Sequence, residues 1–536
     1  MKIRKYLIPA LSVLALASCN YEKINTNIYG VTEEEMKQGG LLYGAPFLDM
    51  QKLVIPIGSP TESTGPGNDL ANTDIMSAGN YIGYWGMNNN WNFNTESTWN
   101  FTDGRMSYAY QNFYSKLFRA WNDIYKHTKE SEEPADKEVQ AVANIVKVMG
   151  WLRATDVFGP IVYTNAGNGD IAPKLDAQDK VYKAMLADLK EASQVLGGTA
   201  TKVLSAYDVI YGGNPQNWTR LANSLMLRMA VRVHFKDMEL AKEYVAYALD
   251  PSHGGVIENM AQEAKIQSTD KLPLMNSMLP TVEDYGECRM GATIWAYMQG
   301  YKDPRLAVNF TTVSGSRFVA LPPTNNNSLN DRAKGGASKP KVSAASPLFW
   351  LRASEVSFLK AEAALYQLTA GNPKELYEEG VTKSFEENGV SGVTSYLQGT
   401  QLPSDVKAYT LPYNYQYACV LSTGNVSPKW NDADTEEVKL QKIITQKYLA
   451  LYPNAVEAWT EYRRTGYPYL LKPAHDKAYA SIGAPEDALT PERFRFAPAE
   501  YGTNPNMSEV PTLLGGDDQG ATKLWWVRDN RPKQPK

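Results

Sequence analysis

The sequence predicts a mainly α-helical protein whose helices are joined by long irregular loops, with a few short strands. The first observation is apolar periodicity: Val142, Val146 and Met149 recur at i, i+4 and i+7, as on one face of a helix. The second is that glycine, proline and asparagine gather between the periodic stretches, where they interrupt helices. The third is composition, since 21% charged and 43% hydrophobic residues are ordinary for a globular chain. Other helical stretches are predicted over 107–129, 182–189, 216–234, 239–249, 353–369, 373–388 and 436–450.

Small residues mark the places where helices can cross closely. They are Ala141 and Ala143 in one stretch, and Ala361, Ala363 and Ala364 in another. Paired amphipathic helices with alanines at the crossings resemble tetratricopeptide units, although no strict repeat of about 34 residues is visible. An irregular helical bundle would leave nearly the same pattern. An array of such pairs would curve and present a concave face to a partner.

The length sets the domain organisation. A chain of 536 residues is longer than one core usually grows, so two lobes or one elongated helical body are expected. We interpret residues 33–536 as one body. It comprises an N-terminal helical part (33–254), an irregular middle (255–350) and a C-terminal part (351–536). In the middle part, 322–341 has no apolar period and is predicted to be a long loop.

The first residues form an export signal. A basic start (Lys2, Arg4 and Lys5) precedes an apolar run over 6–17 that is too short to span a bilayer. The run ends in Leu-Ala-Ser-Cys, with two small residues before Cys19. This ending resembles a bacterial lipobox, in which the cysteine thiol receives a diacylglyceryl group before cleavage exposes its amine.

The leader therefore divides into three parts: 1–18 is a signal peptide, Cys19 is the lipid-anchored residue, and 19–32 is a polar tether. Anchoring by acyl chains is firm, because each buried methylene contributes about 0.8 kcal/mol. An ordinary signal peptide with an incidental cysteine is the alternative. Losing the three basic residues of the leader takes the formal charge from −4 to about −7. With that charge and no basic stripe, nucleic acid is not expected as a partner.

The segment YIGYWGMNNNWNFNTESTWNF, residues 81–101, is the strongest candidate for a binding site. It holds seven aromatic rings and six asparagines with one charged residue. Aromatic planes stack on the C–H faces of sugar rings, and asparagine offers both donors and an acceptor to hydroxyl groups. The predicted ligand-binding residues are Tyr81, Tyr84, Trp85, Trp91 and Trp99. The alternative is that these rings form a hairpin packed under a helix, and Phe93 and Phe101 are better candidates for the core.

Motifs for catalysis, metals or cofactors are absent from the sequence. The histidines at 127, 234, 253 and 475 lie outside metal-ligand spacing, and no nucleophile elbow or phosphate loop occurs. The Gly-Pro-Gly at 65–67 is interpreted as a turn. Cys288 and Cys419 are expected to be buried thiols rather than a disulfide pair, because a chain of this size needs no covalent staple.

Four stretches carry a family resemblance. They are WLRATDVFGPIVY (151–163), NWTRLANSLMLRMAVRV (217–233), YMQGYKDPRL (297–306) and YLALYPNAVEAWTEYRRTGYP (448–468). With the lipobox, they resemble the SusD/RagB family of Bacteroidetes outer membrane lipoproteins, and in particular its SusD-like subgroup. The resemblance runs nearly from end to end. It departs from the family at Val162, where proline is common before the tyrosine, and at Phe496-Ala497, where Tyr-Pro is expected before Glu500 and Asn504.

The charged residues of these motifs are predicted to be structural. Asp156 can bind backbone at a helix exit. Arg220, Arg228 and Arg232 share one helix face. Two arginines at 463–464 lie near glutamates at positions 457 and 461, which suggests ion pairs between buried helices.

The resemblance implies a mainly helical lipoprotein at the surface of the cell outer membrane. It implies capture of an oligosaccharide, or of a peptide as in RagB-like members, and delivery to a SusC-like TonB-dependent transporter without catalysis or cofactor. The family keeps its site in loops near the irregular middle, so Trp295 and Tyr301 are secondary ligand-binding candidates. A surface glycosidase would instead need two carboxylates about 5–10 Å apart in a cleft. A purely scaffolding helical protein would bury all of the loop aromatics.

Overall fold

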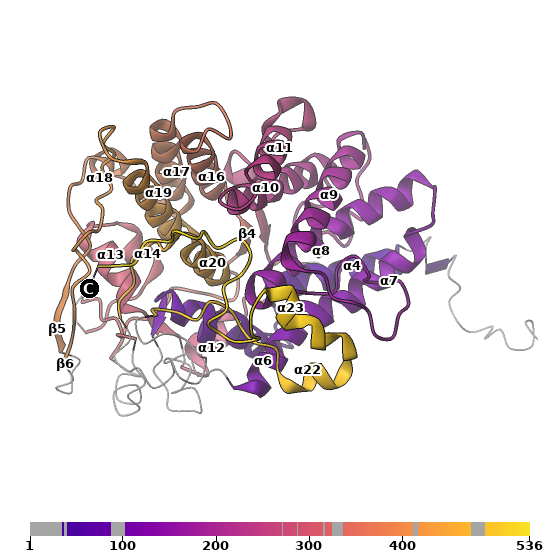
Figure 1. The fold of residues 1–536 in the computed structure, drawn as a ribbon, viewed down its shortest axis with the longest axis horizontal. Coiled ribbons are helices and arrows are strands. Elements are labelled where there is room, and N and C mark those ends of the chain that lie inside the picture. Colours follow the sequence, from indigo (N-terminus) through magenta and orange to yellow (C-terminus); the bar gives the residue numbers. More distant parts are fainter. Residues whose placement is uncertain are drawn as a thin grey trace, which may run out of the picture.

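A computed structural model describes residues 35–36, 40–86, 102–270, 272–286, 288–314, 317–323, 336–410, 416–472 and 488–535. The fold is mainly helical with three small two-stranded sheets (Figure 1), which confirms the predicted fold class. No helix among these residues is long and apolar enough to cross a membrane.

The longer helices are α4 (Leu41–Val54), α7 (Lys116–Thr128), α8 (Pro134–Phe158), α9 (Gln178–Gly197), α10 (Pro215–Val233), α11 (Met238–Leu249), α16 (Ala353–Leu365), α17 (Pro373–Glu387), α19 (Glu436–Leu451) and α20 (Ala455–Thr465). The shorter ones are α5 (Thr64–Leu70), α6 (Asp103–Tyr110), α12 (Met278–Glu283), α13 (Ala292–Gly300), α14 (Arg305–Asn309), α18 (Val393–Leu397), α22 (Pro498–Thr503) and α23 (Val510–Leu514). The strands are β1 (Trp85–Gly86), β2 (Ala264–Ile266), β3 (Arg289–Met290), β4 (Leu348–Leu351), β5 (Val406–Thr410) and β6 (Gln416–Cys419).

The helices α8, α9, α10, α11, α16, α17 and α19 follow one another in an arc across the upper part of Figure 1. The N-termini of α10 and α17 carry the residues that commonly begin a helix, a capping asparagine followed by proline. Pro215 occupies the first turn of α10, and the Asn214 side chain accepts a hydrogen bond from the backbone N–H of Asn217. At α17 the same roles fall to Pro373 and Asn372. These signals explain why the periodic stretches begin where the sequence predicts.

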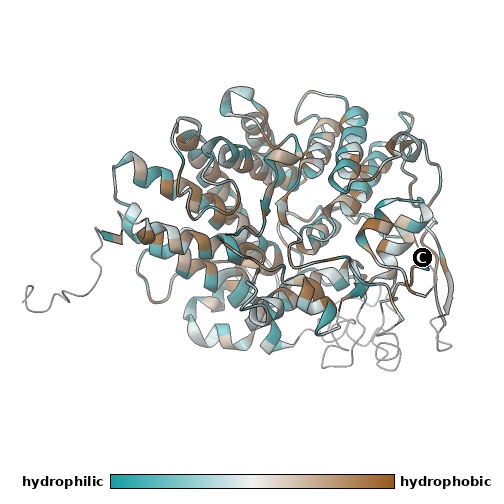
Figure 2. Cartoon of the chain, turned by 180° about the vertical axis from the view of Figure 1, so that it is seen from behind, coloured by the Kyte–Doolittle hydropathy of each residue, from teal (hydrophilic) through white to brown (hydrophobic). Residues whose placement is uncertain are grey.

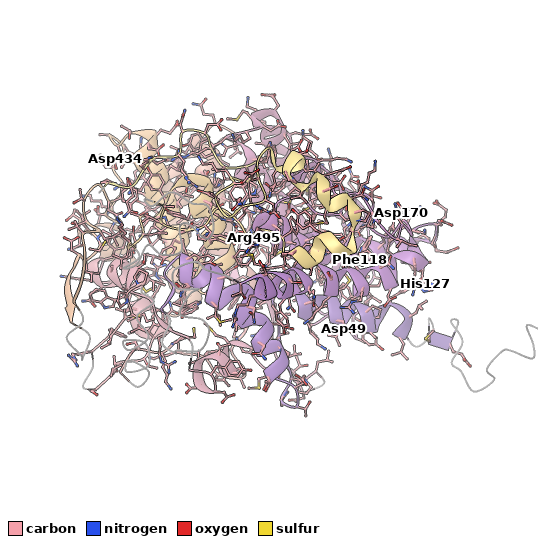
Figure 3. All side chains as sticks on the ribbon, turned by 60° about the horizontal axis from the view of Figure 1, so that its bottom comes forward. Asp49, Phe118, His127, Asp170, Asp434 and Arg495 are labelled. Atoms are coloured by element: carbon pink, nitrogen blue, oxygen red, sulfur yellow. The ribbon has the colours of Figure 1, made fainter. Side chains whose placement is uncertain are left out.

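The N-terminal region differs from the prediction. Residues 65–67, interpreted as a turn, lie inside α5, which continues into a π-helix at Ala71–Gly79. The sequence gives no clear signal for α4, because a glycine at 44 and a proline at 46 both disfavour helices. In the structure, Gly44 lies against the Tyr207 ring. Packing of α4 on α7 and α8 stabilises the helix despite these two residues. In Figure 3, α22 and α23 lie between Arg495 and Asp170, on the same side of the molecule as α7.

Most of the core in the described residues is one cluster of buried side chains that extends from Tyr43 to Val527. Its largest members include Trp151, Trp218, Trp350 and Trp459, all fully buried. Figure 2 shows brown and teal residues on the same helices, as expected for helices with one apolar side. The irregular middle contains only short elements between 255 and 350, and residues 324–335 of the predicted loop lie outside the described residues.

A glycine at the end of α13 tests this packing. A Cβ added at Gly300 would lie 2.4 Å from the carbonyl oxygen of Leu402 and 2.5 Å from the backbone nitrogen of Ser404. We expect Gly300→Ala to destabilise the protein by about 1–3 kcal/mol, because backbone atoms must move to admit the methyl group. Gly197, the last residue of α9, is the matched control, since nothing lies within 4 Å of its added Cβ. Urea unfolding of both variants checks this, and equal midpoints would contradict it.

Candidate functional site

The first part of the aromatic segment lies in the core and not on the surface. Tyr81, Tyr84 and Trp85 are 4%, 0% and 2% exposed. The Tyr84 hydroxyl donates to the backbone oxygen of Tyr448, and the two rings lie 4.7 Å apart. Burial raises the pKa of Tyr84 well above its ordinary value. The expectation that these three rings touch a ligand is therefore corrected, because no face of them is open for stacking.

Glycines around these rings explain the burial. A Cβ on Gly79 would lie 2.2 Å from the Trp85 ring. Gly83 has a φ of +72°, and its added Cβ would lie 2.3 Å from the hydroxyl of Thr293. The glycines thus admit neighbouring side chains of the core, not a ligand.

The remaining candidates fall into two groups. Trp295 lies on α13 and is half-buried. Tyr301, directly after α13, is 3% exposed, and its hydroxyl donates to the Val426 carbonyl at 2.6 Å. Tyr301 is thus a core residue, which corrects that expectation. Trp91, Trp99 and the anchor candidate Cys19 lie outside the described residues.

Three ends of the described chain meet at one place, which we call the β1–β3 corner. Strand β1 pairs antiparallel with β3, and Gly86 faces Arg289 across this pair. Beside them, Gly291 forms a parallel bridge with Leu321. The backbone N–H of Leu471 donates to the Thr293 hydroxyl at 3.4 Å, two residues before Trp295. The corner therefore joins the aromatic segment, the irregular middle and the C-terminal part.

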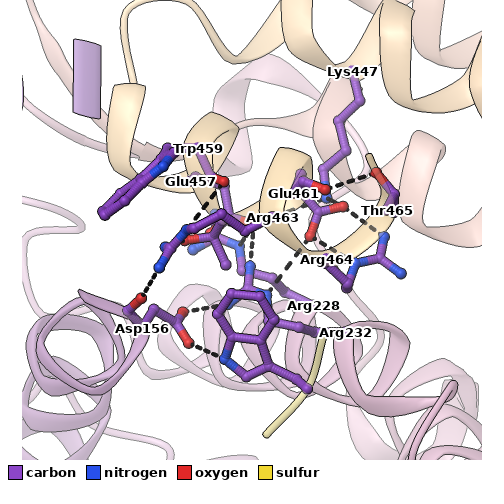
Figure 4. Close-up of polar contacts among 12 residues, drawn as sticks. Asp156, Arg228, Arg232, Lys447, Glu457, Trp459, Glu461, Arg463, Arg464 and Thr465 are labelled. Carbon is purple, nitrogen blue, oxygen red and sulfur yellow. Dashed lines mark hydrogen bonds and ion pairs between the residues drawn. The ribbon is translucent and has the colours of Figure 1, made fainter. Parts of the chain in front are cut away.

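A buried network of ion pairs joins α8, α10, α16, α19 and α20, and Figure 4 shows part of it. Arg228 on α10 forms a bidentate pair with Glu355 of α16, at 2.7 and 2.8 Å. One turn further, Arg232 binds Asp156 of α8 at 2.6 Å and also contacts Glu457 of α20. All of these side chains are less than 9% exposed.

The second half of the network centres on Arg464. Its Nη1 and Nη2 lie 2.6 and 2.7 Å from the two carboxylate oxygens of Glu362, and Nη2 lies 2.6 Å from Glu461. Lys447 lies 3.3 Å from Glu461. Burial opposes ionisation of Glu362, but Arg464 and His234 outweigh it and lower the pKa of Glu362 to about 2. The sequence prediction of structural ion pairs is confirmed for these residues.

Other family motifs are also structural. Arg305 of the third motif forms a fully buried pair with Asp303, with Nη2 and Oδ2 2.6 Å apart. Glu500 accepts a hydrogen bond from the Ser107 hydroxyl at 2.9 Å, and Asn504 donates to the Pro173 carbonyl at 2.8 Å. The altered residues before Glu500 thus leave this loop attached to the body.

The described residues contain no cluster of metal ligands and no disulfide. No group of three or more histidine, cysteine, aspartate or glutamate side chains there could hold a metal ion. Cys288 and Cys419 form no disulfide, and Cys288 is buried while Cys419 is half-buried. The pocket lined by Trp85 and Trp350 has a volume of about 50 Å³, too small for a sugar ring.

A family model described as SusD-like, SusD and RagB outer membrane lipoprotein, matches residues 23–527. No curated protein matches the chain.

Among solved structures, the chain is 59% identical to BT1043, with a TM-score of 0.88 over 92% of this chain and 100% of that chain. A chitin-binding SusD homologue from Flavobacterium johnsoniae is 28% identical, with a TM-score of 0.81 over 92% and 100% of the two chains. A SusD homologue from Bacteroides uniformis is 30% identical, with a TM-score of 0.81 over 91% and 99%.

Proposed function

This chain belongs to the SusD/RagB family of outer membrane lipoproteins, and we propose that it captures oligosaccharides at the cell surface without cleaving them and passes them to a SusC-like TonB-dependent transporter. The observation that carries this proposal is the family match over residues 23–527 together with the likeness to a chitin-binding homologue. The proposed anchor is an acylated Cys19, followed by the tether 19–32.

The glycan contacts are assigned to Trp91 and Trp99, with half-buried Trp295 beside the β1–β3 corner as a further contact. Burial of the first three rings in the core supports this division of the segment. Those rings attach the start of the segment to α19 and α20, since Tyr84 contacts Tyr448 and Tyr81 lies 5.3 Å from Trp459. A rigid base of this kind favours precise presentation of the residues that follow.

The test uses the chain from Asn20 onward, expressed without its anchor. Calorimetry with N-acetylglucosamine oligomers and with plant, host-mucin and microbial glycans would identify the ligand. We expect Trp91→Ala and Trp99→Ala each to weaken binding about tenfold or more, because the stacking plane is lost. Tyr247→Ala is the control, since this half-buried ring stacks on His253 of the short 3-10 helix Pro251–His253 that follows α11.

Two outcomes would contradict the assignment. Glycan binding that survives both tryptophan substitutions would place the contacts elsewhere. Binding of peptides and of no glycan would overturn the proposed ligand class.

A further inference from the structure

A groove of about 780 Å³ separates two helix pairs, α10 with α11 and α16 with α17. This volume is within the range of about 300–1,000 Å³ that ligand sites occupy. Its walls come from α10, the segment after α11, α16 and the turn that leads into α17. Trp295, the described residue assigned to glycan binding, does not line it. The described residues that line it include no aromatic ring, so this lining offers no plane for stacking on a sugar.

The interior of the groove is basic. Arg220 of α10 is half-buried, and its Nη1 donates to the Asn217 side chain at 3.1 Å. In the part of the chain that the structure describes, no carboxylate pairs with Arg220, whereas Arg228 and Arg232 of the same helix bind buried carboxylates. Lys360 of α16 also lines the groove, with 19% of its side chain exposed, but its Nζ lies 3.6 Å from Oε1 of Glu258, so Arg220 is the cation available to a ligand. Arg220 thus differs from Arg228 and Arg232, which share its helix face in the sequence but bind buried carboxylates.

The turn at one end of the groove adds hydrogen-bond donors. Residues 369–371 line the groove between α16 and α17. Their backbone N–H groups donate to no acceptor within the described ranges, and the same holds for Gly255 on the opposite wall. Such N–H groups, together with a guanidinium, suit a carboxylate ligand.

The rim of the groove is acidic. Glu258 is 64% exposed and Glu379 is 40% exposed, and they form partly exposed ion pairs with Lys360 and Lys383. The exposed Glu375 lies on the same side of α17 as Glu379 and accepts a hydrogen bond from the Asn372 side chain at 3.2 Å. A polyanion would be repelled by these carboxylates. A ligand with one carboxylate and nearby positive groups would match both the interior and the rim.

We propose that this groove binds a short zwitterionic peptide, whose C-terminal carboxylate pairs with Arg220 and whose cationic groups face Glu258, Glu375 and Glu379. The inference does not rest on the proposed glycan site, because Trp295, the described candidate of that site, does not line the groove. It gives the protein a second binding surface, formed by helix pairs instead of loops.

The test titrates the chain from Asn20 onward with the peptide Lys-Ala-Ala-Ala, followed by calorimetry. We expect the free acid to bind at least about tenfold more tightly than the C-terminal amide, since a charge-assisted hydrogen bond is lost. Arg220→Gln should remove this preference. Arg119→Gln is the matched control, because Arg119 is an exposed arginine on α7 that does not line the groove.

Each other result overturns the inference. Equal affinity for acid and amide, or no binding at millimolar peptide, would show that Arg220 recognises no carboxylate. Binding of glucuronic acid without binding of the peptide would assign the groove to acidic sugars. Loss of peptide binding in Trp91→Ala would place the peptide in the glycan site. Circular dichroism of Arg220→Gln establishes that the variant is folded.

Discussion

Replacing Arg464 with methionine is expected to destabilise the protein by about 3–5 kcal/mol, which for a marginally stable protein is a large part of the total. The substitution removes the guanidinium that lies between Glu362 and Glu461 and leaves both carboxylates buried. Methionine fills similar space, so the loss arises from uncompensated charge and not from a cavity. The midpoint of urea unfolding measures it.

An exposed ion pair serves as the control for this prediction. Arg495 lies 2.6 Å from Asp103, and their side chains are 31% and 50% exposed. Because water screens such pairs, Arg495→Met should cost no more than about 1 kcal/mol. Equal losses in the two variants would contradict the structural role assigned to the buried network.

The second large effect is a loss of stability in acid that depends on Glu362. The pKa of its carboxyl is lowered from 4.5 to about 2 in the folded protein, with burial opposing this shift and Arg464 and His234 causing it. A lowered folded pKa stabilises the protein above the unfolded pKa, and this stabilisation is lost as the pH falls. We expect a contribution of about 3 kcal/mol at pH 7 that disappears between about pH 5 and pH 2.

Glu362→Gln identifies the residue responsible. The variant should be less stable than the wild type at pH 7, and the difference should shrink as the pH falls from about 5 to 2, because the wild-type carboxyl becomes neutral too. Glu239→Gln is the control, since Glu239 is 85% exposed and pairs with Lys242 on the surface of α11. A difference that stays constant with pH would show that Glu362 does not titrate in this range.

Much of the fold could be predicted from the sequence because the signals are local. Periodic apolar residues predict α8 to α10, and caps such as Asn214 and Asn372 indicate where helices begin. The ion pair of Arg464 with Glu461 could be expected because charged residues three positions apart on one helix lie on the same face, whereas the pair with Glu362 of α16 could not.

The aromatic candidates show the limit of such reasoning. Tyr84 and Trp85 have the composition of a sugar-binding surface, but their burial is decided by Tyr448 and Tyr452, which lie far away in the sequence. The groove beside Arg220 cannot be predicted from the sequence for the same reason. Its walls come from two helix pairs, so spacing along α10 alone cannot distinguish Arg220 from Arg228.

One incubation distinguishes capture of the glycan from its cleavage. The chain from Asn20 onward is mixed with the glycan that it binds most tightly, and bound glycan and newly formed reducing ends are measured over time. We expect stoichiometric binding, recovery of the glycan at its original length and no increase in reducing ends. Reducing ends that accumulate beyond the amount of protein would contradict it and identify the chain as a surface glycosidase.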